Sequence, residues 1–203
     1  MLSSRSAKRF LKHVRQTCKK HGVGFKIGRG KLIRMRPYGF MVAGYFDEDE
    51  KVLVCSKGTS QESFLSILVH EFAHLLQWIE NEKTYCLCSH VKYGNVQNAI
   101  CMWISNELTI KDSLVRSYTK KMIACELNAE RRAVKLIKQF NLPINLDEYS
   151  SSASAGLFTH LMTAKTKQWD FKIGIKQKMA SGTSLRRSFK TLPKSVETTF
   201  SKA

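Results

Sequence analysis

Apolar residues recur at helical spacing in four stretches of the chain and alternate with polar residues in one. The helical stretches are residues 5–21, 60–80, 113–141 and 148–169. Residues 23–56 alternate instead, with turn signals at Gly28–Gly30, Pro37–Gly39 and Asp47–Glu50. The pattern predicts an α+β fold: an N-terminal helix, then three or four strands in a small antiparallel or mixed sheet, then a helical C-terminal half.

Local signals set the expected boundaries. The sequence TSQE, residues 59–62, predicts a capping box at the start of the second helix, and Pro143 predicts the end of the third. A short helix is expected near residues 96–104. We expect one domain over residues 1–180, followed by a basic, partly disordered tail over residues 181–203.

The second helical stretch contains LVHEFAHLLQW, residues 68–78. On a helix, His70 and His74 share one face, so their imidazoles can bind one Zn²⁺ ion. Glu71 follows the first histidine, where a carboxylate can take a proton from a water molecule activated by the metal. The HExxH spacing predicts a catalytic zinc site, although two histidines satisfied within a helical core would give the same letters.

Such a site needs a third protein ligand, and two candidates are present. His90 follows His74 by sixteen residues. Glu126 and Glu130 lie on the apolar face of the third helix, where a carboxylate must be paired or bound to metal. Glu126 as a ligand and Glu130 as the hydrogen-bond partner of a ligand histidine would explain both. Alternatively, both glutamates pair with Arg131, Arg132 or Lys135 on the surface.

The six cysteines are scattered, which favours free thiols over a disulfide framework. The sequence CLCSH places Cys86, Cys88 and His90 close together. They can bind a metal, but their spacing lacks the gap of two to four residues found in ordinary zinc sites. Buried free cysteines are the alternative interpretation.

The net charge of +18 is concentrated at the two ends of the chain. Residues 1–36 carry 12 Lys and Arg and no acidic residue, and residues 165–203 carry 10 basic and 2 acidic residues. Basic ends suit a nucleic acid or another acidic surface, with Arg5, Lys8, Arg9, Lys12 and Arg15 as the expected phosphate-facing stripe. Charge for solubility alone is the other interpretation. No apolar stretch is long enough to span a membrane, so we expect no membrane partner and a cytoplasmic protein.

The motifs HEFAHLLQW and ELNAE resemble those of gluzincin metallopeptidases, among them the ImmA/IrrE-like families, and most of all small metallopeptidase-like proteins of tailed phages and bacteria. The resemblance covers about residues 40–170. It implies a zincin-like fold, one zinc ion held by His70, His74 and Glu126, and Glu71 as general base. Glu130 stands where one gluzincin family has an aspartate, and a phage origin would place the protein in host cytoplasm.

The resemblance also implies a side chain that stabilises the oxyanion, for which the candidates are Tyr118, His160 and Tyr93. His90 as third ligand would instead resemble the SprT-like, DNA-dependent proteases. However, His90 is followed by Val91, where those proteins have a glycine.

Three functions fit these observations. The first is a zinc endopeptidase that cleaves a peptide or protein substrate, with the strand at residues 51–56 aligning an extended peptide. The second is a nucleic-acid-associated protease, or a basic DNA-binding factor with a structural zinc. The third is a zinc-binding module without turnover.

Overall fold

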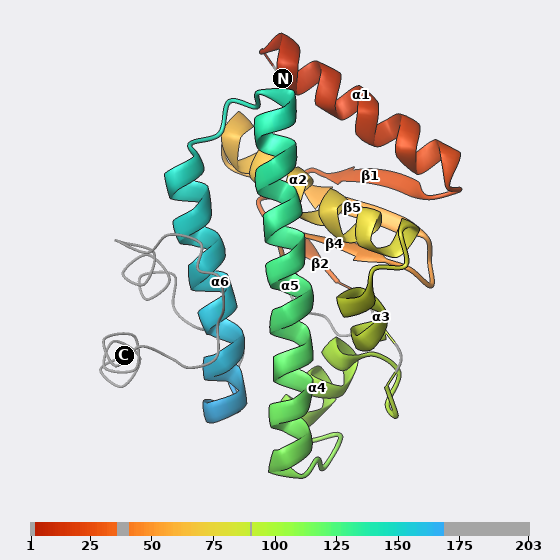
Figure 1. Cartoon of the computed structure of the whole chain (residues 1–203), viewed down its shortest axis with the longest axis vertical. Helices are drawn as coiled ribbons and strands as arrows, with labels where there is room; N and C mark the ends of the chain where they lie inside the picture. Colours follow the sequence, from red (N-terminus) through yellow and green to blue (C-terminus); the bar gives the residue numbers. More distant parts are fainter. Residues whose placement is uncertain (1–2, 36–40, 90, 169–203) are drawn as a thin grey trace. The chain divides into compact units, whose positions relative to one another are not determined.

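The computed structural model describes residues 3–35, 41–89 and 91–168 (Figure 1). In chain order its elements are α1 (Arg5–Lys20), β1 (Gly24–Gly28), β2 (Ile33–Arg34), β3 (Met41–Val42), β4 (Gly44–Asp47), β5 (Val52–Ser56), α2 (Gln61–Ile79), α3 (Lys83–Ser89), α4 (Val96–Ile104), α5 (Asp112–Phe140) and α6 (Leu146–Thr166). An N-terminal helix, a small mixed sheet and a mainly helical C-terminal half confirm the predicted α+β class.

The described residues form two compact units. The first unit contains those of Met1–Glu82 together with Ala129–Asn145, and the second contains those of Lys83–Asn128 and Leu146–Ala203. The prediction of one domain over residues 1–180 stays a prediction. The predicted tail at 181–203 and the turn at Pro37–Gly39 lie outside the described residues.

A three-stranded sheet with the order β1-β5-β4 lies in the first unit. Strand β1 pairs in parallel with β5, from Gly24 opposite Val52 onward, and β4 pairs antiparallel with β5, with Gly44 opposite Cys55. Because β5 has neighbours on both sides, the prediction that this strand aligns a peptide by edge pairing is wrong. Strand β4 is an outer strand instead, and β2 and β3 form a separate two-stranded ribbon.

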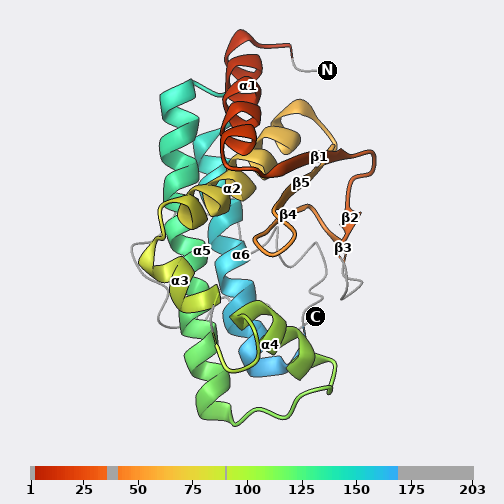
Figure 2. The same cartoon turned by 90° about the vertical axis from the view of Figure 1, so that its right-hand side faces the viewer.

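Helix α1 packs one apolar face into the first unit and lies beside β1 (Figures 1 and 2). Its buried residues Ala7, Phe10, Val14 and Cys18 recur every three or four positions. The Phe10 ring lies 5.8 Å from the Phe72 ring of α2 and 5.1 Å from the Phe140 ring of α5. This aromatic cluster fixes the three helices of the first unit together, since each buried ring removes a large apolar area from water.

Helix α2 carries the HExxH sequence and packs against β4 and β5. Ser60 caps it, because the Ser60 hydroxyl accepts a hydrogen bond from the Ser63 amide. The predicted capping box would have put the cap at Thr59, one residue earlier. Leu65, Leu68 and Phe72 are fully buried, so α2 is held along its length by the core.

The second unit is helical in its described residues. Val96, Ala99 and Ile100 of α4 pack with Val115 and Met122 of α5, and Ala164 of α6 lies against the same cluster. Helix α3 was not predicted, whereas α4 has the predicted bounds.

Two further expectations concern the described part of the chain. No helix within it is both long enough and apolar enough to cross a bilayer. All six cysteines are free thiols, as predicted.

Candidate metal centre

His70 and His74 occupy one face of helix α2, as their spacing of four residues predicts. Their ring centroids are 4.8 Å apart and the rings meet edge to face. The helix is capped at its start and buried along its opposite face, so its backbone holds both imidazoles at a fixed separation. The pair can therefore act as a two-point clamp on a single ion.

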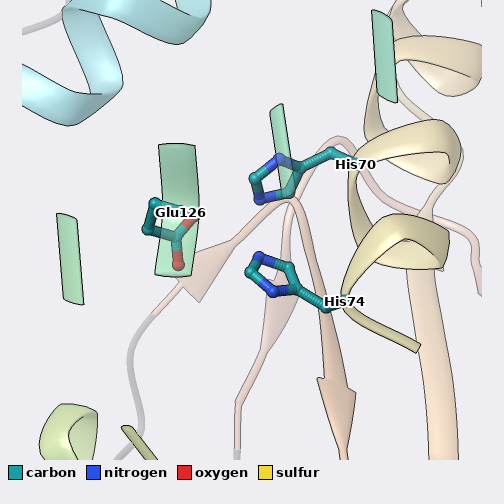
Figure 3. A group of neighbouring side chains, drawn as sticks. All are labelled: His70, His74 and Glu126. Carbon is teal, nitrogen blue, oxygen red and sulfur yellow. The ribbon is translucent and has the colours of Figure 1, made fainter. Parts of the chain in front are cut away.

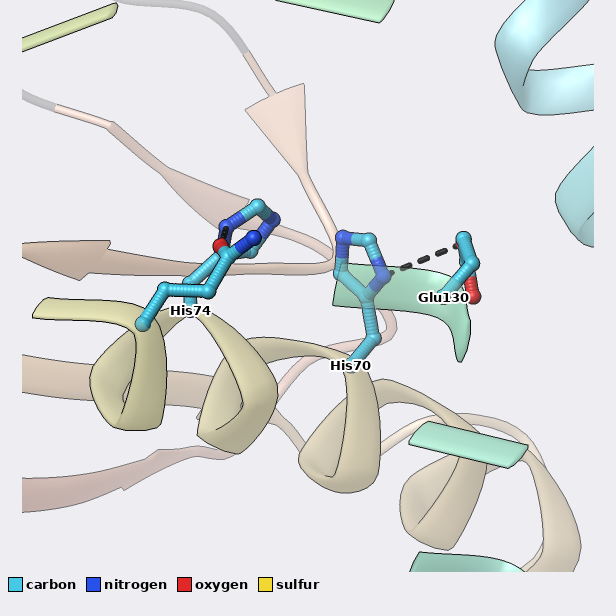
Figure 4. Close-up of polar contacts among 4 residues, drawn as sticks. His70, His74 and Glu130 are labelled. Atoms are coloured by element: carbon cyan, nitrogen blue, oxygen red, sulfur yellow. Dashed lines mark hydrogen bonds and ion pairs between the residues drawn. The ribbon is translucent and has the colours of Figure 1, made fainter. Parts of the chain in front are cut away.

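The Nδ1 atoms of both histidines face oxygen atoms of the protein (Figure 4). His70 Nδ1 lies 3.1 Å from Glu130 Oε1, and the Glu130 side chain is only 11% exposed. His74 Nδ1 lies 2.9 Å from the amide oxygen of Gln77, which is fully buried. An amide oxygen only accepts, so the Gln77 contact favours a proton on His74 Nδ1 and leaves His74 Nε2 as the atom able to bind a metal. The negative charge of Glu130 beside His70 Nδ1 favours the same arrangement there, although this pair lacks hydrogen-bond geometry.

Glu126 faces the two imidazoles from helix α5 (Figure 3). Helix α5 runs without a break from Asp112 to Phe140, so Glu126 lies one turn before Glu130 and on the same face. His70, His74 and Glu126 each offer one ligand atom, and these atoms all lie within 4.8 Å of one another. The structure thus brings together the predicted His-His-Glu group.

This group fits a zinc ion. Two neutral imidazoles and one carboxylate are ligands that zinc accepts, and three protein ligands leave a fourth position open for water or substrate. Bonds of about 2.0–2.2 Å in a tetrahedron separate ligand atoms by roughly 3.5 Å, so a spread of at most 4.8 Å closes with small side-chain rotations. The group can therefore hold one metal ion, consistent with an HExxH…E-type site.

Glu71 lies on the sheet side of α2 and is 8% exposed. Gly44 of β4 touches it, because a Cβ atom built on Gly44 would lie 2.6 Å from Glu71 Cγ and 2.9 Å from Glu71 Oε1. Burial, followed by the negative charge of Glu71, raises the pKa of the Cys55 thiol well above its ordinary value. Both observations place the Glu71 carboxylate against β4 and β5.

Three of the remaining predicted site residues lie in the second unit, and the fourth lies outside the described residues. Tyr118 is 3% exposed within the apolar cluster of the second unit, and Tyr93 packs against the same cluster. His160 is on α6, and His90 lies outside the described residues. The oxyanion role of Tyr118, Tyr93 or His160, and the ligand role of His90, stay predictions.

The structure bears in part on two alternatives from the sequence, a metal site at Cys86, Cys88 and His90, and surface ion pairs of Glu126 and Glu130. Cys86 is exposed and Cys88 half-buried on α3, but a site that includes His90 stays a prediction. Glu130 faces His70, and Arg132 donates to Glu80 at 2.6 Å.

Gln77 and Gly44, which contact His74 and Glu71, were not predicted from the sequence. Gln77 follows His74 by three residues, and a single polar residue within the apolar run Leu75–Ile79 was a weak signal that it has a polar partner. The contact of Gly44 with Glu71 depends on how β4 packs against α2, and no local pattern in the sequence encodes it.

No protein-family model, curated protein or solved structure matches the chain. The candidate metal centre is therefore recognised from the geometry of its residues alone.

Proposed function

We propose that the chain is a zinc-dependent peptidase in which His70, His74 and Glu126 hold one zinc ion and Glu71 is the general base. The observation that carries the proposal is the group of three ligand atoms within 4.8 Å of one another, together with the buried Glu71 that follows His70 in HExxH spacing. A structural site needs closed coordination and no base, whereas this group supplies three ligands and a neighbouring carboxylate.

A bound zinc ion would act as a Lewis acid on the scissile carbonyl and lower the pKa of the attacking water. Glu71 would take the proton from that water and deliver it to the leaving amine. Glu130 and Gln77 would orient His70 and His74 through their Nδ1 atoms, so that little reorganisation is needed when the metal binds. Gly44 would allow Glu71 to approach the sheet without a steric clash.

We propose that the substrate is an extended peptide or protein segment that pairs with the outer strand β4. Strand β4 stands at the end of the described strand order β1-β5-β4, the position at which an extended segment adds to a sheet through main-chain hydrogen bonds. Gly44 lies on β4 and touches Glu71, so a segment aligned there would run past the general base.

Metal analysis and a cleavage assay on Glu71→Gln test the proposal. The wild-type chain should contain about one zinc ion and cleave an unfolded protein such as casein. The Glu71→Gln variant should keep the zinc and lose about a hundredfold to ten-thousandfold in cleavage rate, since the amide cannot accept the proton.

Glu80→Gln is the matched control, because Glu80 ends the same helix with an exposed side chain and pairs with Arg132. It should cleave like the wild type. A folded chain that binds no zinc would overturn the proposal, and so would a Glu71→Gln variant that cleaves at the wild-type rate. Zinc binding without cleavage of any protein would favour the binding-module alternative.

A further inference from the structure

Five basic side chains form a continuous stripe along one side of helix α1. Arg5, Lys8, Lys12, Arg15 and Lys19 follow one another at intervals of three or four residues, and all five are exposed. At 1.5 Å per residue the stripe is about 21 Å long. It can therefore follow several successive phosphates of one strand.

Arg9, which the sequence placed in this stripe, points elsewhere. Its Nη2 atom donates to the Phe140 carbonyl at 3.2 Å, and its guanidinium lies over the Phe140 ring. Arg9 thus fastens α1 to the end of α5, and Lys19 takes its place in the stripe. We call the set Arg5, Lys8, Lys12, Arg15 and Lys19 the α1 stripe.

The C-terminal part of the stripe borders an open hollow between α1 and β1. The hollow has a volume of about 580 Å³ and is lined by Arg15, Cys18, Lys19, Val23, Phe25 and Ile27. Ile27 is 42% exposed, so part of the apolar wall is accessible. A volume in the range of small-ligand pockets, with apolar walls and two cations at the rim, suits a flat aromatic group attached to an anion.

The chain segment that forms this surface carries charge of one sign. Residues 3–35 contain no aspartate or glutamate. Exposed basic residues are Lys26 on β1, Arg29 and Lys31 after it, and Arg34 on β2. The nearest acidic residues in the sheet topology are in the turn Asp47–Glu50, next to Lys51, whose carbonyl accepts from the Gly24 amide. The α1 stripe leads away from that turn, from Lys19 toward Arg5.

We propose that the α1 stripe and the adjoining hollow bind single-stranded nucleic acid. Phosphates would contact the stripe, and an unpaired base would stack on Phe25 in the hollow. A basic track with an aromatic residue beside it is the usual composition of surfaces that bind single strands. A bilayer is disfavoured because the apolar face of α1, with Phe10 and Val14, is already buried in the protein. A duplex is disfavoured because paired bases cannot enter the hollow.

Fluorescence anisotropy with the full chain and a labelled oligothymidylate of about 20 nucleotides tests the stripe. For single strands each phosphate contact contributes a slope of about −0.7 in log affinity against log salt, or about fivefold at 0.1 M salt. Lys12→Gln with Arg15→Gln should therefore weaken binding by about 25-fold at 0.1 M salt and reduce the slope by about 1.4.

Lys135→Gln with Lys138→Gln is the matched control. Both lysines are exposed on α5, and this pair lowers the net charge by the same amount. It should leave affinity and slope nearly unchanged. The basic residues at 165–203 are present in every variant, so they cannot cause a difference between the two double variants. Equal losses in the two double variants would show that net charge alone drives binding and would overturn the proposal. Wild-type affinity in the α1 variant would overturn it as well.

Phe25→Ala tests the hollow. Loss of one base stack should weaken binding of the oligothymidylate by roughly tenfold. Phe25→Leu keeps an apolar side chain in β1 and removes the π face, so it should show a similar loss of affinity. It replaces the alanine variant if that variant does not fold. Full affinity in Phe25→Leu, or a duplex of the same length bound as tightly as the single strand, would overturn the stacking site. Glu71→Gln should bind the strand like the wild type, which separates this result from the peptidase test.

Discussion

At the scale of single residues, Gly44 controls how closely Glu71 can approach the sheet. Because Gly44 has no side chain, the Glu71 carboxylate has room beside β4. Gly44 itself lies opposite Cys55 in the β4–β5 pair. Any side chain at position 44 would have to displace both Glu71 and Ile67, because a Cβ there would lie within 2.9 Å of each.

Gly44→Ala should therefore strongly lower the proposed peptidase activity while leaving the proposed zinc binding intact. We expect overpacking to reduce the free energy of unfolding by about 1–3 kcal/mol. Gly24→Ala on β1 is the control, since its new Cβ would meet Val52 at an ordinary 3.6 Å. Cleavage rate, zinc content and thermal unfolding of the two variants decide. Full activity in Gly44→Ala would mean that Glu71 is not held by this contact.

Gln77 is a second residue that no sequence motif marks but whose substitution should change metal binding. Its amide oxygen is the partner of His74 Nδ1, and its side chain is fully buried. Gln77→Leu should weaken zinc affinity by about tenfold to a hundredfold, since the imidazole loses the group that fixes its tautomer and orientation.

Gln77→Glu keeps an acceptor oxygen at the same place and should retain most of the affinity. Competition titration with a chromophoric zinc chelator measures both variants. Equal zinc affinity in Gln77→Leu and the wild type would show that His74 needs no such support.

At the scale of elements, α1, α2 and the end of α5 meet in an aromatic cluster that includes a histidine. The His13 ring lies 5.6 Å from the Phe72 ring and 5.1 Å from the Phe140 ring. Burial in this cluster lowers the pKa of His13 below its ordinary value. The native chain therefore binds this proton less readily than the unfolded chain does.

This linkage predicts an acid-sensitive attachment of α1. The contribution of His13 to stability is present above its unfolded pKa of about 6.5 and is lost as the pH falls below it. His13→Phe keeps a ring in the cluster and removes the titration. Its melting temperature should therefore fall less than that of the wild type between about pH 7.5 and 5.5. Parallel melting curves across this range would contradict the assignment.

Elements with strong periodicity could be predicted, and those defined by distant pairing could not. The spacing of Leu68, Phe72 and Leu75 predicted α2, and that of Met122, Ala129 and Ala133 predicted α5, each to within one or two residues. The central place of β5 depends on β1, which is distant in the chain, so the run Val52–Ser56 alone could not reveal it. The cap moved from Thr59 to Ser60 because neighbouring hydroxyl residues can both serve as caps.

At the scale of the whole molecule, the candidate metal ligands could be predicted from the sequence, whereas the residues that position them could not. HExxH and the glutamates on the apolar face of α5 were recognisable because metal chemistry requires fixed residue types at helical spacing. The Nδ1 partner of His74, the approach of Gly44 and the reassignment of Arg9 from the basic stripe to Phe140 arise only when elements pack together. Side-chain contacts of this kind have no period along the chain.

Zinc binding should stabilise the native chain as a whole, because the ligands lie on α2 and α5 and an unfolded chain does not preassemble them. Free zinc at about 100 times its dissociation constant stabilises by about 2.7 kcal/mol, which corresponds to a rise in melting temperature of roughly 5–10 °C for a chain of this size. Glu126→Gln removes the charged ligand and should lose most of the rise at the same zinc concentration. Magnesium, which prefers octahedral oxygen ligands, should cause no rise in either protein. An equal rise in the wild type and in Glu126→Gln would mean that zinc binds without Glu126 and would remove the basis of the proposed centre.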